Sequence, residues 1–298
     1  MLKDLIAGAL FTCAVAGSAS AETFAEFFPD LAQEADAEIL ALLEPLDFQQ
    51  GRVSAGDGLV TLNVADGFYF LNADDARYVL GDLWGNPPSP DVLGMVFPSH
   101  ITPLHSNSWG MEIYFDEIGY VPDEEAEGYD YDAVLRVLQE DTLAENGWRV
   151  ENGYPSIRLL GWAESPVYDP AHRSLYWAKE LQFQGDTENT LNYNIRVLGR
   201  HGVLVQNFIA PMSALDEVRA AVPEILAMTE FSEGNRYGDF DASMDQVAAY
   251  GIGGLIAGKV IAKTGMLAFL LVFLKKAWVL LFLPLFWLKN RFTGSRTT

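Results

Sequence analysis

The sequence is almost free of cysteine. Its single cysteine, Cys13, lies in the apolar run near the start of the chain, so a chain that loses this run has none. That absence excludes disulfide bonds, a thiol nucleophile and a thiolate metal site. Stability must then come from a hydrophobic core, which a region of roughly 220 residues is long enough to bury.

Basic side chains are also scarce. The 298 residues carry 19 Lys and Arg against 41 Asp and Glu. Residues 22–245 hold 11 basic and 40 acidic side chains, a net charge of −29, whereas residues 246–298 hold seven basic side chains and no acidic one. An acidic surface of this kind repels nucleic acid and anionic lipid head groups. We therefore expect no nucleic-acid partner and no domain that lies flat on a membrane.

Familiar catalytic and cofactor motifs are missing from the sequence. It contains no G-x-S-x-G, H-E-x-x-H, P-loop or G-x-G-x-x-G pattern. His100 and His105 are five residues apart in a predicted loop, which is not the i, i+4 helical spacing of a zinc pair. The sequence thus indicates no cofactor and no catalytic residue, and an enzyme is the less favoured class.

The chain opens with the pattern of a secretory signal peptide. Lys3 precedes an apolar run over residues 5–16, and small residues end at Ala19-Ser20-Ala21. This order predicts export, with residues 1–21 as the signal peptide and cleavage before Glu22. An uncleaved N-terminal anchor is the alternative.

The other end, residues 246–298, is apolar and basic. From Thr264 to Leu288 only Lys275 and Lys276 are charged, over about the 20 residues or more that a spanning helix needs. About fifteen Leu, Phe and Val residues favour insertion by roughly 7 kcal/mol, and the two lysines oppose it by nearly as much. A window shifted to residues 247–274 gives a similar balance. One crossing, a two-segment hairpin and an amphipathic segment in the interface all stay open.

Between these ends, strand patterns form a block with helices outside it. Alternating runs and short turns over residues 156–210 predict an antiparallel meander with one wet face. A hairpin is expected around Gly56-Asp57-Gly58, and Asn72 is a predicted helix N-cap. Other strands are expected over residues 68–71, 92–97 and 109–115, and helices over 29–43, 73–83, 130–146 and 213–228. We therefore predict one exported α+β domain over residues 22–245, with an antiparallel sheet and helices packed on one face.

Several sequence blocks recur together in a known family. They are Leu62-Asn63-Val64, Trp84-Gly85-Asn86-Pro87-Pro88, Gly161-Trp162-Ala163-Glu164, Tyr176-Trp177-Ala178-Lys179-Glu180-Leu181, the run from Leu191 to Arg200, and Glu233-Gly234-Asn235-Arg236-Tyr237. In that order they resemble a bacterial family of uncharacterised membrane-anchored proteins, domain of unknown function 2167. The resemblance implies an envelope protein with a signal peptide and a C-terminal membrane segment, in the bacterial inner membrane with its main domain in the periplasm. It implies no activity, substrate or catalytic residue.

An acidic loop supplies the candidate metal ligands. Asp123, Glu125 and Glu127 provide enough oxygen atoms for a calcium ion. The loop lacks the one-three-five spacing and the closing glutamate of an EF-hand, so a solvated acidic loop is the simpler interpretation.

Two other segments are candidates for partner contacts. Trp84, Asn86 and Pro87 lie in a proline-rich loop of the kind that lines grooves for peptides or glycans. Arg236 and Tyr237 come just before the apolar tail and are candidate partner contacts. The alternative is that Arg236 pairs with Glu233 or Asp239 and docks the linker onto the domain.

These features together favour a non-enzymatic domain that binds a protein or another envelope component. Its C-terminal segment would associate with the lipid bilayer. A hydrolase with an unconventional site and a divalent-cation sensor are the alternative hypotheses.

Overall fold

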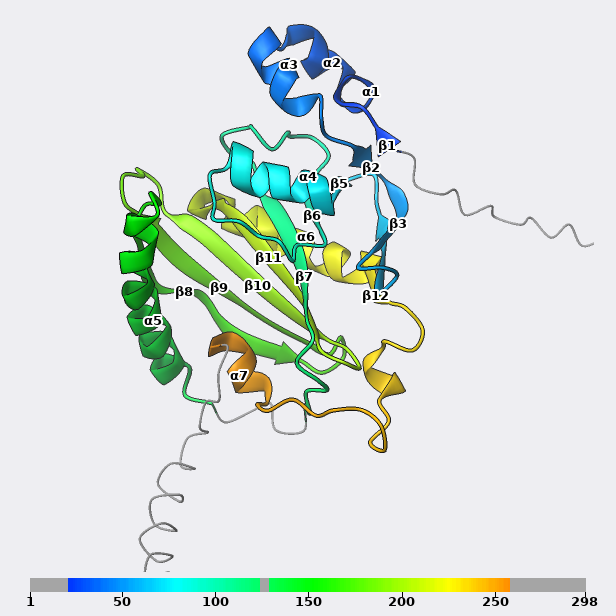
Figure 1. The fold of residues 1–298 in the computed structure, drawn as a ribbon, viewed down its shortest axis with the longest axis vertical. Helices are drawn as coiled ribbons and strands as arrows, with labels where there is room; N and C mark the ends of the chain where they lie inside the picture. Colours follow the sequence, from blue (N-terminus) through cyan, green and yellow to red (C-terminus); the bar gives the residue numbers. More distant parts are fainter. Residues whose placement is uncertain (1–20, 124–128, 258–298) are drawn as a thin grey trace, which may run out of the picture. The chain divides into compact units, whose positions relative to one another are not determined.

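The computed structural model describes residues 21–123 and 129–257 (Figure 1). Three predictions lie outside these residues: the signal peptide over 1–20, the loop residues Glu125 and Glu127, and the apolar window from Thr264 to Leu288. No helix in the described part of the chain is long and apolar enough to cross a membrane.

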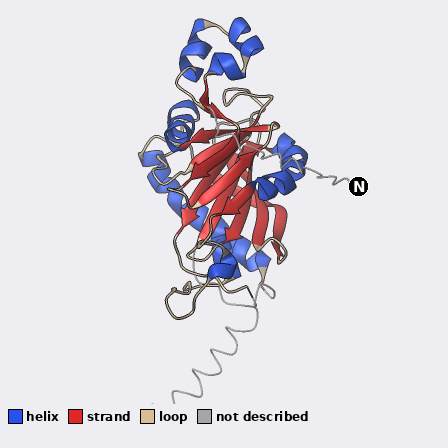
Figure 2. Cartoon of the chain, turned by 90° about the vertical axis from the view of Figure 1, so that its right-hand side faces the viewer, coloured by secondary structure: helices blue, strands red, loops and turns tan. Residues whose placement is uncertain are grey.

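The chain divides into two compact units. Unit 1 comprises Met1–Phe115 and Val205–Arg236, and unit 2 comprises Asp116–Leu204 and Tyr237–Thr298. Long strands and mostly short helices make up the described residues (Figure 2). The predicted α+β class with a mostly antiparallel sheet is therefore confirmed.

Unit 1 contains strands in two sheets. The strand order in the larger sheet is β1-β2-β5-β6-β7-β11, and in the smaller one β12-β4-β3. The strands are β1 Ala21–Glu22, β2 Phe48–Gln49, β3 Gly51–Ala55, β4 Val60–Val64, β5 Phe68–Asn72, β6 Gly94–Pro98, β7 Gly110–Asp116, β11 Val203–Pro211 and β12 Thr229–Phe231. Strands β3 and β4 pair antiparallel from Gly51 opposite Val64 to Ala55 opposite Val60, which confirms the predicted hairpin.

The helices described in unit 1 are α1 Phe24–Phe27, α2 Pro29–Glu34, α3 Ala37–Leu43, α4 Ala73–Tyr78, the π-helix η1 Val79–Leu83, the 3-10 turn η2 Met212–Ala214 and α6 Leu215–Met228. Polar side chains cap α1, α3 and α4. Asn72 accepts hydrogen bonds from the first-turn amides of α4, as predicted. The single helix expected over residues 29–43 is wrong. The side chain of Asp36 accepts from the amides of Glu38 and Ile39 and so starts a new helix after a break.

Helices pack on both faces of the larger sheet in unit 1, which corrects the prediction of helices on one face. Helices α4 and η1 pack with Tyr69 and Leu71 of β5. On the opposite face Trp109 packs against Phe68, and its indole nitrogen donates to Glu217 of α6 at 2.8 Å. The physical reason is that β5 and β6 are apolar without alternation and are buried almost throughout.

Unit 2 contains the predicted meander. Strands β8 Ile157–Asp169, β9 Ser174–Phe183 and β10 Thr190–Leu198 pair antiparallel in the order β10-β9-β8. Helix α5, Tyr131–Glu151, lies along β8 (Figure 1) and ends five residues later than predicted. The 3-10 turn η3, Tyr237–Asp239, and helix α7, Ile252–Ala257, complete the unit.

The prediction that one face of this meander is exposed to solvent is wrong. Asn194 and Arg196 stand opposite Trp177 and Leu175 in the ladder, so they share the face that packs with α5 and α7. Asn194 is only 2% exposed. Its amide donates to the backbone and side-chain oxygens of Asn192, and this satisfies a polar group that burial would otherwise penalise.

Residues 246–257, which the sequence assigned to the membrane segment, are part of the fold of unit 2. Val247 forms a parallel bridge with Tyr120. Ile252 and Ile256 of α7 are buried in a core that includes Trp177. Gly253 has no room for a side chain, because a Cβ there would lie 2.2 Å from the ring of Tyr129.

Candidate functional site

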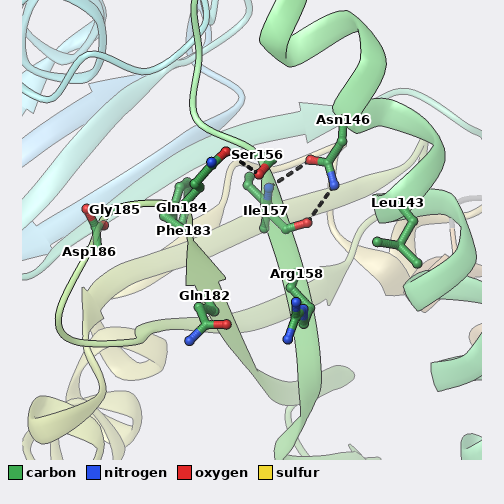
Figure 3. A pocket seen from close by; sticks show the side chains of 10 residues that line it. All are labelled: Leu143, Asn146, Ser156, Ile157, Arg158, Gln182, Phe183, Gln184, Gly185 and Asp186. Atoms are coloured by element: carbon green, nitrogen blue, oxygen red, sulfur yellow. Dashed lines mark hydrogen bonds between the residues drawn. The ribbon is translucent and has the colours of Figure 1, made fainter.

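A pocket of about 480 Å³ opens in unit 2 beside α5 (Figure 3). Its walls are the C-terminal half of α5, the start of β8, the end of β9 and the turn that follows β9. Its lining includes Leu143 and Asn146 from α5, Ser156 just before β8, Arg158 at the start of β8, and Gln182 and Asp186 from β9 and its turn.

Side-chain amides from α5 hold the wall beside β8. The amide nitrogen of Asn146 donates to the carbonyl of Ile157 at 2.8 Å, and its oxygen accepts from the Ile157 amide at 2.7 Å. Gln139 donates to the carbonyls of Leu159 and Leu160 at 3.2 and 3.3 Å. These contacts take the place of a neighbouring strand at both backbone groups of Ile157 and at the carbonyls of Leu159 and Leu160.

A second set of bonds ties β8 to the end of β9. The hydroxyl of Ser156 donates to the side-chain oxygen of Gln184 at 2.9 Å. The backbone amide of Gln184 donates to the backbone carbonyl of Ser156 at the same distance. The pocket therefore has a framework whose hydrogen bonds are satisfied within the protein.

Three polar side chains in the pocket are not used by this framework. Within the described residues, Arg158, Gln182 and Asp186 make no side-chain hydrogen bond or ion pair. Arg158 and Gln182 are directly opposite in the β8–β9 ladder, and Figure 3 shows both side chains beside the strands that form the floor. An uncommitted guanidinium, amide and carboxylate in one depression are suited to binding a ligand.

The second pocket, in unit 1, is lined differently. It measures about 560 Å³ and includes Arg77, Pro90 and Phe115. Arg77 already pairs with Asp74 and donates to the Pro90 carbonyl. Its cation is therefore committed within the protein, unlike the cation in the pocket beside α5.

The segment just before the apolar tail is held to unit 2 by a carboxylate. Asp123 accepts hydrogen bonds from Tyr168 at 2.6 Å and Tyr237 at 3.0 Å, and it pairs with Arg173. Partial burial raises the pKa of Asp123, but the hydrogen bonds from Tyr168, Tyr237 and Arg173 lower it more, so the net pKa lies below its ordinary value. The ring of Tyr237 also stacks on Tyr120 at 4.5 Å. Tyr237, a candidate partner contact from the sequence, thus helps to dock this segment on unit 2.

A second ion pair holds the same segment further along. Arg200 donates to both oxygens of Asp245 at 2.7 and 3.1 Å. The Asp245 side chain is 5% exposed, and the hydrogen bonds from Arg200 lower the pKa of this carboxyl. Together with the bridge at Val247, these contacts fix the chain up to the start of α7.

The other predicted contact residues belong to unit 1. Trp84 is half-buried; its indole nitrogen donates to the Pro103 carbonyl at 2.9 Å and its ring meets Phe97 edge-on. Asn86 and Pro87 follow in the loop and are also half-buried. Here the tryptophan anchors its own loop.

Arg236 is exposed, and its Nε donates to the Phe231 carbonyl at 3.4 Å. It is the last residue of unit 1, whereas Tyr237 is the first residue of the returning part of unit 2. The structure therefore divides the predicted contact residues between the two units.

The metal prediction falls partly outside the described residues. Asp123 is engaged by Arg173 and two tyrosines, and Glu125 and Glu127 are not described. In residues 21–123 and 129–257 there is no group of three or more His, Cys, Asp and Glu side chains placed to hold a metal ion.

The pocket residues beside α5 were not selected from the sequence. Arg158 and Gln182 lie 24 positions apart and meet only through the register of β8 and β9. The alternation of the two strands was visible, but no sequence motif marks the end of a ladder where a helix also approaches.

Two solved structures to which this chain is similar are both distant. The solution structure of cyanobacterial PsbP (CyanoP) from Synechocystis sp. PCC 6803 is 12% identical, with a TM-score of 0.33 over 61% of this chain and 91% of that one. The Ran-binding protein Mog1p of Saccharomyces cerevisiae is 11% identical, with a TM-score of 0.34 over 65% of this chain and 100% of that one. Likenesses this weak carry no conclusion about function.

Comparison with family models identifies the family of this chain, which the solved structures do not. No curated protein sequence matches this chain. The model described as "Protein of unknown function (DUF2167)" matches residues 47–286, which include strands β2 to β12 and the whole of the pocket beside α5. The chain therefore belongs to the DUF2167 family of proteins of unknown function.

Proposed function

We propose that this protein is a binding domain of the bacterial envelope, anchored to the inner membrane by its C-terminal segment and placed in the periplasm. The observation that carries the binding role is the pocket beside α5. Its framework is satisfied internally, while Arg158, Gln182 and Asp186 have no partner in the described chain. A pocket with fixed walls and uncommitted polar groups loses little conformational freedom when a ligand enters.

The anchoring role is supported by the junction before the tail. Residues 237–257 are fixed to unit 2 through Asp123, Arg200 and the core around α7. The apolar window from Thr264 to Leu288 therefore begins only a few residues after a helix that is packed into the same unit as the pocket. Because α7 is buried in protein, it favours this window over residues 247–274 as the membrane segment.

Labelling of single cysteines tests the location. A chain that has lost its leader has no cysteine, so Glu151→Cys at the exposed end of α5 adds a single thiol. We expect a membrane-impermeant maleimide to label this thiol in intact spheroplasts, and the protein to sediment with membranes. Labelling only after lysis, or recovery in the soluble fraction, would contradict the proposal.

Turnover assays test the binding role against the hydrolase alternative. The purified full chain is expected to release no product from ester, peptide or phosphate substrates. Turnover that disappears on changing a single residue would replace the binding role with an enzymatic one.

A further inference from the structure

The chemistry of the pocket beside α5 limits the charge of its ligand. One guanidinium, from Arg158, and one carboxylate, from Asp186, are the ionised groups that line it, and neither is paired within the described residues. The surrounding chain over residues 22–245 carries a net charge of −29, which disfavours an anion at long range. A cation would be repelled by the guanidinium of Arg158. A ligand without net charge fits this balance best.

The hydrogen-bonding groups require a ligand that both donates and accepts. Arg158 can only donate, ionised Asp186 can only accept, and the amide of Gln182 does both. Arg158 and Gln182 stand on adjacent strands as a directly opposed pair. Donors and acceptors that line one pocket from adjacent strands match the neighbouring hydroxyl groups of a sugar ring.

An extended peptide also donates and accepts, but its usual mode of binding is blocked here. Peptides of this kind add as a strand to a free sheet edge. At the start of β8, the amide and carbonyl of Ile157 and the carbonyls of Leu159 and Leu160 are already bonded to the side chains of Asn146 and Gln139. The pocket therefore offers side-chain groups, and not a strand edge, to its ligand.

Apolar surface beside these polar groups suits the C–H faces of a sugar. Leu143 is 60% exposed at the side of the pocket, and Phe183 is half-buried in its lining. The volume of about 480 Å³ lies in the range of small-ligand sites.

We propose that the pocket between α5 and the β8–β9 ladder binds an uncharged saccharide, which hydrogen-bonds to Arg158, Gln182 and Asp186. The proposal rests on the proposed function, since it names the ligand class of the same pocket. It assigns the guanidinium and the amide to ring hydroxyl oxygens, and the carboxylate to ring hydroxyl protons.

The test uses the full chain in lauryldimethylamine oxide micelles, because maltoside detergents would present sugar head groups to the pocket. The probe is the β-1,4-linked dimer of N-acetylglucosamine, observed by saturation-transfer difference NMR and titrated by calorimetry. We expect the dimer to bind, and the Kd to rise at least tenfold in Arg158→Ala and in Gln182→Ala. Both residues are exposed, so the variants should melt at the temperature of the parent chain.

Arg136→Ala is the matched control. Arg136 lies on α5, is exposed, and likewise makes no side-chain hydrogen bond or ion pair within the described residues, so this change removes the same charge outside the pocket. Binding of the dimer that survives in Arg136→Ala and is lost in Arg158→Ala supports the proposal. No binding of the dimer to the parent chain, or equal weakening in both arginine variants, overturns it.

A zwitterionic dipeptide, alanyl-alanine, separates this inference from the proposed function. If the dipeptide binds in an Arg158-dependent way and the sugar does not, the saccharide class is wrong while the binding role stands. If the Glu151→Cys chain labels only after lysis, the proposed envelope location fails, whatever the pocket binds.

Discussion

Removing one hydroxyl group tests how firmly the segment before the tail is held. The variant Tyr237→Phe deletes the donor of two hydrogen bonds, to Oδ1 of Asp123 at 3.0 Å and to the Val121 carbonyl at 3.1 Å. It keeps the aromatic ring that stacks on Tyr120. The change therefore isolates the polar part of the docking contact.

The expected effect follows from the charge and the burial of Asp123. A hydrogen bond to a charged group contributes about 1.5–3 kcal/mol net. Asp123 keeps its bonds to Tyr168 and Arg173, and its side chain is 12% exposed, so water compensates only part of the loss. We expect the free energy of opening residues 237–257 to fall by about 2 kcal/mol, which is about a 30-fold change in the opening equilibrium.

Hydrogen exchange measures this opening directly. The amide of Tyr120 donates to Gln246 and the amide of Ala248 donates to Tyr120, both at 2.8 Å, so these amides exchange when the segment detaches. Tyr154→Phe is the control, since the Tyr154 ring stacks on Trp148 and its hydroxyl makes no bond in the described chain. Unchanged protection at Ala248 in Tyr237→Phe, or an equal loss in Tyr154→Phe, would refute the docking role.

Three further changes test separate parts of the fold. Burial raises the pKa of Asp75 to about 6, so the folded chain keeps a proton that the unfolded chain loses between pH ~4 and ~6, and stability from this group falls as pH rises through that window. The free energy of unfolding of Asp75→Asn, relative to that of the parent chain, should therefore rise by up to about 3 kcal/mol on going from pH 4 to 7. A difference in urea midpoint between variant and parent that is the same at both pH values would contradict this. Gly253→Ala should cost about 1–3 kcal/mol through a steric clash and lower the melting temperature, whereas Gly251→Ala, with 3.4 Å to its nearest neighbour, should change it little. Asn146→Ala should speed amide exchange at Ile157 at least tenfold, because an edge amide loses its only acceptor among the described atoms.

The sequence predicted local structure where one side chain or one short pattern decides it. The hairpin around Gly56-Asp57-Gly58 and the cap at Asn72 are examples. It failed where a competing local signal was overlooked, as at Asp36, whose carboxylate caps the start of a new helix. It also failed where tertiary packing reverses the usual meaning of polarity, as at Asn194, which is buried with its amide satisfied by Asn192.

The candidate site was only partly accessible to sequence reasoning. Tyr237 was selected for its place before the tail, but its partner Asp123 lies more than a hundred residues earlier, and no local pattern connects them. Arg158 and Gln182 become neighbours through the register of two strands, and that register includes bulges further along β8. A shift of one residue before this pair would turn one of the two side chains to the opposite face.

The path of the chain through the two units has a consequence for the order of folding. Unit 1 is interrupted by residues 116–204 and regains its last strand, β12, only at Thr229–Phe231, which pairs with β4. The core of unit 2 in turn is incomplete until residues 237–257 supply α7. Because the chain is synthesised from its N-terminus, neither unit can complete its fold until some 230 residues have been made. Pairings of such long sequence separation fold slowly, so the newly made chain would expose apolar β5 and β6 for longer than a protein built from consecutive domains.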